Sequence, residues 1–237
     1  MTSKRFWKGF GIVSAEMLGA MGLFTVALAG IVFWIRPAMR RHKPMDMRVF
    51  DVVHEYTNHV NTEIMSLVTT LAKHQFLIPA NLLLIFYFLF VRKHTWFSIR
   101  IAAIALSSLG LMIVLKQLFQ RKRPEIPLLN HAQGLSFPSG HALMSVTFYG
   151  LLIYIIMQTI SNKPLKWSLT GFFLLLIILI GFSRVYLRVH YASDVLAGFI
   201  IGLLWLLISL AILKRIESYN KQQIILPEDV SVPANVQ

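Results

Sequence analysis

The chain contains six apolar stretches, and their length constrains the fold more than any other feature of the sequence. A helix needs about 20 mostly apolar residues to cross the hydrocarbon core of a membrane, and several of these stretches reach that length. Hydrophobic residues make up 56% of the 237 residues, too many for an ordinary soluble domain. We therefore predict an all-α, multi-pass membrane protein, with residues 1–237 forming a single domain built on six transmembrane helices. The predicted spans are 10–35, 75–92, 97–120, 138–160, 167–187 and 192–213.

Two other parts of the chain are more polar. Residues 36–74 mix apolar and polar side chains, which favours an amphipathic segment on the membrane surface or capping the bundle, between the first and second spans. The chain turns polar again after Lys214, and we expect a flexible tail from about 218. The basic residues before the stretch 10–35 resemble the start of a signal peptide. That stretch is far longer than the roughly 7–15 apolar residues of a signal sequence, so we predict a retained first helix.

The chain is strongly basic, with a formal net charge of +13. Because the cations are scattered between apolar spans, we expect membrane lipids as partners and no nucleic acid. Cysteine is absent, so the chain offers neither a disulfide framework nor a thiolate metal site.

A small group of ionisable residues sits at the ends of the apolar spans. Charge in or beside hydrocarbon is expensive and usually functional. In a six-span bundle the end of span three, the start of span four, the end of span five and the start of span six lie at one membrane face. Six ionisable residues occupy those places, and together they suggest a pocket for a multiply charged anion such as phosphate. They are Lys116, Arg123, His141, Arg184, His190 and Asp194.

The first part of this group follows span three. Lys116 and Arg123 are seven residues apart, about two helical turns, so they point the same way if the helix persists that far. Pro124 discourages further helix. The neighbouring Arg121 and Lys122 are interpreted as positive anchors at the end of a span.

The second part precedes span four. Pro138 suits a first helical position, with Ser136 or Phe137 as the cap. Free backbone N–H groups at a helix start, together with the helix dipole, favour an anion. Here those groups belong to Ser139, Gly140 and His141. A helix start that merely contains a histidine would explain this part when it is taken alone.

The third part joins spans five and six. His190 and Asp194 are four residues apart, so the carboxylate can hold one ring nitrogen and leave the other free as nucleophile or base. A structural Asp–His pair that ties two helices together is the alternative.

Taken together, these parts resemble the motifs of the type 2 phosphatidic acid phosphatase superfamily, the lipid phosphate phosphatases. Lys116 through Arg123-Pro124 matches the first motif, and the residues 138–141 match the second, Pro-Ser-Gly-His. Ser183-Arg184, His190 and Asp194 match the third. The compact chain is similar to the bacterial members.

The resemblance implies a role for each matched residue. His190 would attack phosphorus and form a phosphohistidine, Asp194 would orient it, and His141 would protonate the leaving oxygen. The groups implied to hold the phosphoryl oxygens are Lys116, Arg123, Arg184, Ser139 and the backbone N–H of Gly140.

The function that this implies is a membrane phosphatase that removes the terminal phosphate from a lipid phosphate or diphosphate. Phosphatidylglycerol phosphate, phosphatidic acid and undecaprenyl diphosphate are the candidate substrates. We expect no metal or other cofactor, because no second carboxylate lies near the group in the sequence. Two alternatives stay open, namely a phosphotransferase that uses the same site and a non-catalytic carrier of anionic lipid.

The number of spans also predicts the orientation. Six spans put both termini on one side, and the basic residues of that side favour the cytoplasm. We therefore expect cytoplasmic termini in the inner (cytoplasmic) membrane of the cell, and an active site at the extracytoplasmic face.

Overall fold

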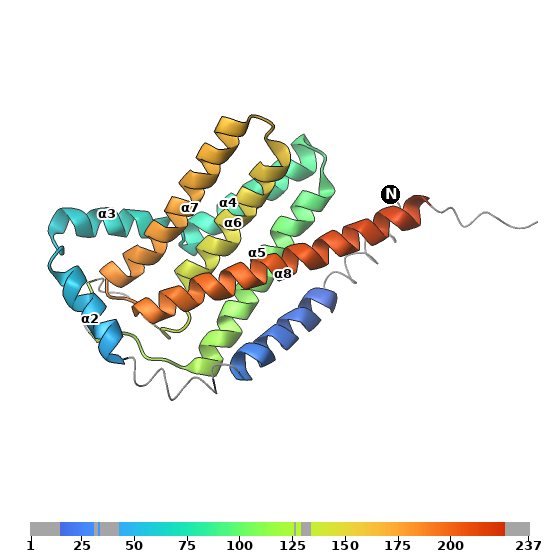
Figure 1. Cartoon of the computed structure of the whole chain (residues 1–237). Helices are drawn as coiled ribbons and strands as arrows, with labels where there is room; N and C mark the ends of the chain where they lie inside the picture. Colours follow the sequence, from blue (N-terminus) through green and yellow to red (C-terminus); the bar gives the residue numbers. More distant parts are fainter. Residues whose placement is uncertain (1–14, 31–32, 34–42, 126, 129–133, 226–237) are drawn as a thin grey trace, which may run out of the picture.

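The computed structural model describes residues 15–30, 33, 43–125, 127–128 and 134–225, and these contain helices and no strand. The prediction of an all-α fold is confirmed. An N-terminal helix, Ala15–Gly30, is followed by eight further elements, of which Figure 1 labels the α-helices. They are α2 (Lys43–His54), α3 (His59–Thr70), α4 (His74–Phe86), the π-helical turn η1 (Tyr87–Val91), α5 (Thr95–Phe119), α6 (Gly140–Thr159), α7 (Lys163–Tyr186) and α8 (Ala192–Ile225).

Five helices in the described part of the chain are long and apolar enough to cross a membrane. They correspond to the predicted spans two to six, with ends that differ by a few residues in most cases. The helix Ala15–Gly30 falls inside the first predicted span but is shorter than a full crossing, and most of the remainder of the range 10–35 lies outside the described residues. The predicted count of six spans is therefore approximate.

The boundaries of the last span differ from the prediction. α8 does not stop near 213 but continues to Ile225, so the first residues of the predicted flexible tail are helical. The rest of that tail, 226–237, lies outside the described residues.

The mixed segment between the first two spans forms two helices. α2 packs against α7 and α8, and α3 packs against α7. On α2, the side chains of Phe50 and Val53 are buried against the bundle, while Asp51 faces outward. This alternation explains why the segment reads as amphipathic, and the two helices cover one end of the bundle (Figure 1).

α6 lies at the centre of the bundle and packs most extensively against α8 and α7. Glycines on α8 allow this close approach: a Cβ at Gly202 would lie 2.9 Å from the carbonyl oxygen of Leu143 on α6. Small residues let membrane helices pack backbone to backbone in this way. The fully buried side chains of Leu143, Trp205 and Leu213 fill the adjoining core.

The four helix ends that the sequence placed at one face meet at one end of the molecule, beside α2 (Figure 1). Backbone hydrogen bonds connect the segments there. Ser139 N–H donates to Asp194 O at 3.0 Å, and Ser136 N–H donates to Arg121 O at 2.7 Å. The start of α6 is thereby joined to the start of α8 and to the segment after α5.

Candidate active site

The segment after α5 leaves the helix earlier than predicted. α5 ends at Phe119, and Gln120 adopts a left-handed conformation with φ of 45°. Lys116 and Arg123 therefore do not share a helical face, which corrects the prediction from their spacing. Lys116 reaches the site from the last turn of α5, where its Nζ donates to Leu135 O at 2.6 Å.

Arg123 reaches the site from the extended segment. Its Nη1 donates to Val189 O at 3.0 Å and its Nε donates to Gly134 O at 3.2 Å. Burial lowers the pKa of Arg123, and the negative charge of Asp194 opposes that shift. A guanidinium remains charged under these conditions, so Arg123 supplies a fixed cation.

The start of α6 also differs from the prediction. The helix begins at Gly140, and Ser139 caps it, its hydroxyl oxygen accepting from Ala142 N–H at 3.4 Å. Pro138 is therefore not the first helical residue. The N–H of Ser139 is not free either, because it donates to Asp194 O. The first-turn N–H groups that remain at this end belong to Gly140 and His141.

Close packing at Gly140 explains why a side chain is absent there. A Cβ at this position would lie 2.6 Å from Met112 Sδ and 3.9 Å from Lys116 Cε. The stem of Lys116 thus passes directly beside the first turn of α6, which brings an ammonium group toward the positive end of the helix dipole.

Arg184 stands at the end of α7. Its Nη1 donates to the hydroxyl of Thr69 on α3 at 2.7 Å, and its backbone oxygen accepts from His190 N–H at 3.3 Å. The turn that follows contains Arg188 in a left-handed conformation with φ of 54°. Arg184 and His190 are brought together by this turn.

His190 and Asp194 form the buried centre of the site. His190 Nδ1 lies 3.8 Å from Asp194 Oδ2 and 3.5 Å from Ser136 Oγ. The same carboxylate oxygen accepts from the hydroxyl of Ser136 and from Tyr191 N–H, the latter at 3.0 Å. Since Nδ1 faces the carboxylate, Nε2 is the nitrogen left for chemistry.

The surroundings keep His190 neutral. Burial, together with the positive charges of Arg123 and Arg184, lowers its pKa to about 4, although the contact with Asp194 opposes the shift. A neutral imidazole carries the lone pair that a nucleophile or base requires.

Arg121 is not a surface anchor, and this corrects the prediction for that residue. Its Nη1 donates to Asp194 Oδ1 at 2.5 Å and to Ser193 Oγ at 2.8 Å. Its Nη2 donates to Asp46 Oδ2 on α2 at 2.9 Å. Asp194 therefore has a stronger partner than His190, which sequence reasoning took as its nearest one. Lys122 is exposed, in keeping with its predicted role as an anchor.

Two nitrogens at the site are buried without a hydrogen-bond partner among the described residues, His141 Nε2 and Arg184 Nε. Leaving such a group unsatisfied costs about 1–3 kcal/mol, so a ligand that accepts or donates there would be favoured. The charges of Arg184 and His190 act on His141, and so does that of Lys73.

The sequence analysis missed four other side chains that shape this centre. Ser136 was considered only as a helix cap, and no role was given to Asp46, Thr69 or Ser193. Among the residues that the structure describes, no three histidine or acidic side chains converge in a way that could hold a metal ion.

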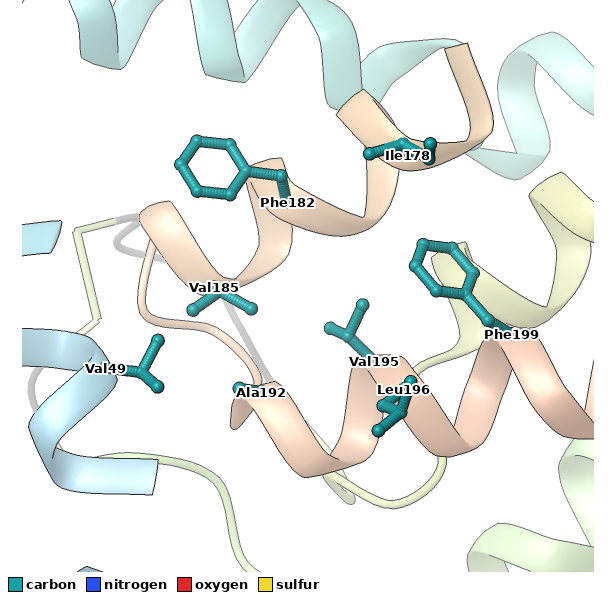
Figure 2. A pocket seen from close by; sticks show the side chains of 8 residues that line it. All are labelled: Val49, Ile178, Phe182, Val185, Ala192, Val195, Leu196 and Phe199. Atoms are coloured by element: carbon teal, nitrogen blue, oxygen red, sulfur yellow. The ribbon is translucent and has the colours of Figure 1, made fainter. Parts of the chain in front are cut away.

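Two grooves open beside the centre, and they share Val49, Ala192 and Leu196. The larger groove, of about 470 Å³, is lined in addition by Met45, Asp46, Arg121 and Ser193. The apolar groove, of about 280 Å³, lies between α2, α7 and α8. Figure 2 shows its lining, which is Val49, Ile178, Phe182, Val185, Ala192, Val195, Leu196 and Phe199. A hydrocarbon surface thus leads to the charged end of the bundle.

The chain is similar to several known proteins. The model of the PAP2 superfamily matches residues 97–217, a range that holds all the motif residues. Phosphatidylglycerophosphatase B of Bacillus subtilis (strain 168) is 33% identical over 146 residues, which are 60% of this chain and 70% of that protein. Undecaprenyl-diphosphatase BcrC of the same organism is 28% identical over 169 residues, 68% of this chain and 80% of that protein.

Two solved structures share the fold. A transmembrane PAP2-type phosphatidylglycerolphosphate phosphatase from Bacillus subtilis aligns with a TM-score of 0.65 and 25% identity, over 86% of this chain and 95% of that one. Aquifex aeolicus LpxE aligns with a TM-score of 0.54 and 27% identity, over 70% and 94% of the two chains. Sequence, motifs and fold agree, and this multi-pass membrane protein belongs to the PAP2 superfamily.

Proposed function

We propose that the chain is a membrane phosphatase that hydrolyses the terminal phosphate of a lipid phosphate or diphosphate through a phosphohistidine on His190. The observation that carries this proposal is the buried pair of His190 and Asp194, surrounded by fixed cations. Phosphoryl transfer depends mainly on positioning and on charge stabilisation, and this site offers both.

In the first step Nε2 of His190 attacks phosphorus, and the bond from phosphorus to the leaving oxygen breaks. Asp194 holds the Nδ1 side of the ring, which gains positive charge as the N–P bond forms. His141, protonated at this stage, gives its proton to the leaving oxygen. Water then attacks the phosphohistidine while the now neutral His141 accepts its proton; the N–P bond breaks, inorganic phosphate is released, and His190 is again neutral and His141 again protonated.

The transferring oxygens need compensating charge. Lys116 provides it from the end of α5, Arg123 from the segment after α5 and Arg184 from the end of α7. The cap Ser139 and the first-turn N–H of Gly140 add donors from the start of α6. Preorganised donors of this kind can stabilise the transition state without a divalent metal. We therefore propose metal-independent hydrolysis.

The substrate class follows from the grooves. The apolar groove beside the site suits a hydrocarbon chain, which a soluble phosphate ester would not need. The named activities of the relatives add candidates, namely phosphatidylglycerol phosphate and undecaprenyl diphosphate. Phosphatidic acid ends in a phosphate monoester, as phosphatidylglycerol phosphate does, and completes the set.

We further propose that the site faces the extracytoplasmic side of the cell membrane and that the termini are cytoplasmic. The chain has no native cysteine, so single cysteines report topology directly. Glu55→Cys lies in the exposed turn after α2, and Lys163→Cys lies at the exposed start of α7 at the far end of the bundle. An impermeant maleimide added to intact cells should label the first and spare the second. The reverse pattern would place the site in the cytoplasm.

The activity test is phosphate release by detergent-purified protein from a panel of lipid phosphates and diphosphates, with EDTA present. His190→Ala should abolish release, while His59→Ala, an exposed histidine, should leave it unchanged. Rapid quenching with labelled substrate should trap an acid-labile, alkali-stable phosphoenzyme that His190→Ala lacks. Activity that EDTA removes and Mg²⁺ restores would refute metal independence.

The same assay separates the alternatives. A phosphotransferase would form the trapped phosphoenzyme but deliver phosphate to an added lipid alcohol. A non-catalytic carrier would form no phosphoenzyme and release no phosphate from any lipid in the panel.

A further inference from the structure

The carboxylate of Asp194 uses its two oxygens for different partners. Oδ2 faces His190 Nδ1 and accepts from Ser136 and Tyr191 N–H, while Oδ1 is held by Arg121 Nη1 at 2.5 Å. The second guanidinium nitrogen of Arg121 holds Asp46 at 2.9 Å. One side chain from the segment after α5 thus joins a carboxylate of α8 to a carboxylate of α2.

The three side chains of this arrangement are largely buried. The side chain of Asp194 is 0% exposed, that of Asp46 is 7% exposed and that of Arg121 is 23% exposed. Ser193 completes the bonding of Asp46, through its N–H at 3.0 Å and its hydroxyl at 2.7 Å. The guanidinium carbon also lies 4.2 Å from the centre of the Tyr191 ring. Surface ion pairs rarely show such complete satisfaction, and a planar guanidinium suits a bridge that a lysine cannot make.

We propose that Arg121 and Asp46 are positioning residues for Asp194, so that the bridge from Asp46 through Arg121 fixes both the rotamer and the effective charge of the carboxylate that orients His190. The proposal rests on the proposed function of His190 as nucleophile. Neither residue belongs to the motifs, and neither touches the reacting atoms.

The physical reason is geometric first. With Oδ1 held by Arg121, rotation of the Asp194 carboxylate is restricted, and Oδ2 stays directed at His190. Without the bridge only the hydrogen bonds from Ser136 and Tyr191 N–H hold the carboxylate, so it can turn further toward the other cations of the site and orients the ring of His190 less strictly. A reacting group that is misplaced by about 1 Å loses about 100-fold in rate.

The bridge also sets the charge that His190 experiences. The groups that face His190 are Asp194 from α8, Arg184 from α7, His141 from α6 and Arg123 from the segment after α5. Arg121 partly neutralises Asp194, and Asp46 partly neutralises Arg121. Removal of Arg121 leaves a more negative Asp194, which favours protonated His190. Removal of Asp46 leaves Arg121 paired with Asp194 alone, and this does not favour protonated His190.

The test compares Arg121→Gln, Asp46→Asn and the double variant, with Lys122→Gln and Asp51→Asn as matched controls. Lys122 is the exposed neighbour of Arg121, and Asp51 is an exposed acid on the same helix as Asp46. kcat and KM are measured with a short-chain phosphatidic acid from about pH 4 to pH 8, the range in which His190 would titrate.

We expect Arg121→Gln to lower kcat by about 10- to 100-fold with KM within about twofold, as for groups that act through a catalytic residue. The acid limb of its kcat/KM profile moves to higher pH. Asp46→Asn lowers kcat less and does not move that limb upward. The double variant is no worse than Arg121→Gln, because both changes break one contact chain. Arg121→Lys recovers part of kcat.

An Arg121→Gln protein with unchanged kcat and pH profile would overturn the proposal, and so would losses that simply add in the double variant. If Arg121→Gln does not fold, Asp46→Asn and Arg121→Lys still decide the matter by the same readouts. If His190→Ala retains activity, the proposed function itself has failed. If His190→Ala is inactive while Arg121→Gln behaves as wild type, only the bridge has failed.

Discussion

Gly198 lies where α8 crosses the first turn of α6, and Gly198→Ala tests whether this close approach holds the active site in shape. A Cβ at Gly198 would lie 2.8 Å from Ser139 O and 2.9 Å from Ala142 Cβ. Neither atom can move as the tip of a flexible side chain would, since one belongs to the backbone and the other is fixed to it. The start of α6 and the start of α8 must therefore separate.

Two effects of opposite sign determine the change in stability. Alanine is favoured over glycine inside a helix by about 1 kcal/mol. Overpacking a tight contact costs about 1–3 kcal/mol, so we expect the free energy of unfolding to fall by about 0–2 kcal/mol. Turnover should suffer more, because Ser139 N–H donates to Asp194 O across this same contact at 3.0 Å. We expect kcat to fall by about 10- to 100-fold in protein that remains folded.

The assay pairs thermal unfolding in detergent with phosphate release from a lipid phosphate, and Gly171→Ala is the control. Gly171 lies in α7, and a Cβ there meets nothing within 4 Å. That variant should keep full activity and gain up to about 1 kcal/mol from helix propensity. A Gly198→Ala protein that is as active as wild type would refute the reasoning, because it would show that α6 and α8 tolerate separation at the site.

Three further predictions follow from the structure. Because burial lowers the pKa of His190 to about 4, the imidazole stays neutral as the pH falls through 6.5, so kcat/KM should hold to about pH 5; an acid limb at pH 6.5 or above would contradict this. Leu196→Trp, which fills the shared wall of the grooves, should raise KM for a long-chain lipid phosphate by about tenfold. Leu203→Trp, two turns along the same helix and outside the groove linings, should not, and equal effects would argue against the groove. Glu217→Gln leaves Arg100 without its buried carboxylate and should lower stability by about 3–5 kcal/mol in thermal or denaturant unfolding, with activity per folded molecule unchanged.

The sequence was most informative where a physical constraint acts on a single element. Apolar length predicted spans two to six to within a few residues, except at the end of α8, because a membrane helix must satisfy its own backbone. Topology then placed the ends of α5, α6, α7 and α8 together without any knowledge of side-chain contacts. The motif residues Lys116 and His190 meet at one end of the bundle for that reason.

Spacing arguments failed where the chain leaves the helix. Lys116 and Arg123 are seven positions apart, but the left-handed Gln120 between them removes the helical relation. A helical start at Pro138 was predicted from residue preference alone, and the true cap, Ser139, is set by its hydrogen bond to α8. Such choices depend on tertiary contacts, which local preference does not contain.

The ion pairs of Arg121 with Asp194 and Asp46 could not be predicted from the sequence for a related reason. A basic residue after a membrane span is most often an anchor, and Asp46 lies 75 positions away in a segment predicted only as amphipathic. The scarcity of acids, 10 in a chain with 23 Lys and Arg, could have marked Asp46 as worth explaining. It could not have named the partner, because several cations were equally available.

The balance of charges at the site favours the binding of a phosphate. Among the described residues, the cations Lys116, Arg123, Arg184 and Arg121 lie near two carboxylates, Asp194 and Asp46. These four cations and two carboxylates leave an excess of about two positive charges, while a phosphate monoester carries about −1.5 to −2. In a low-dielectric site such an excess is costly, and a bound dianion removes the cost. By pairing Arg121 with Asp46, the bridge keeps that excess close to the charge of one phosphate, so binding and orientation of the nucleophile depend on the same ion pairs.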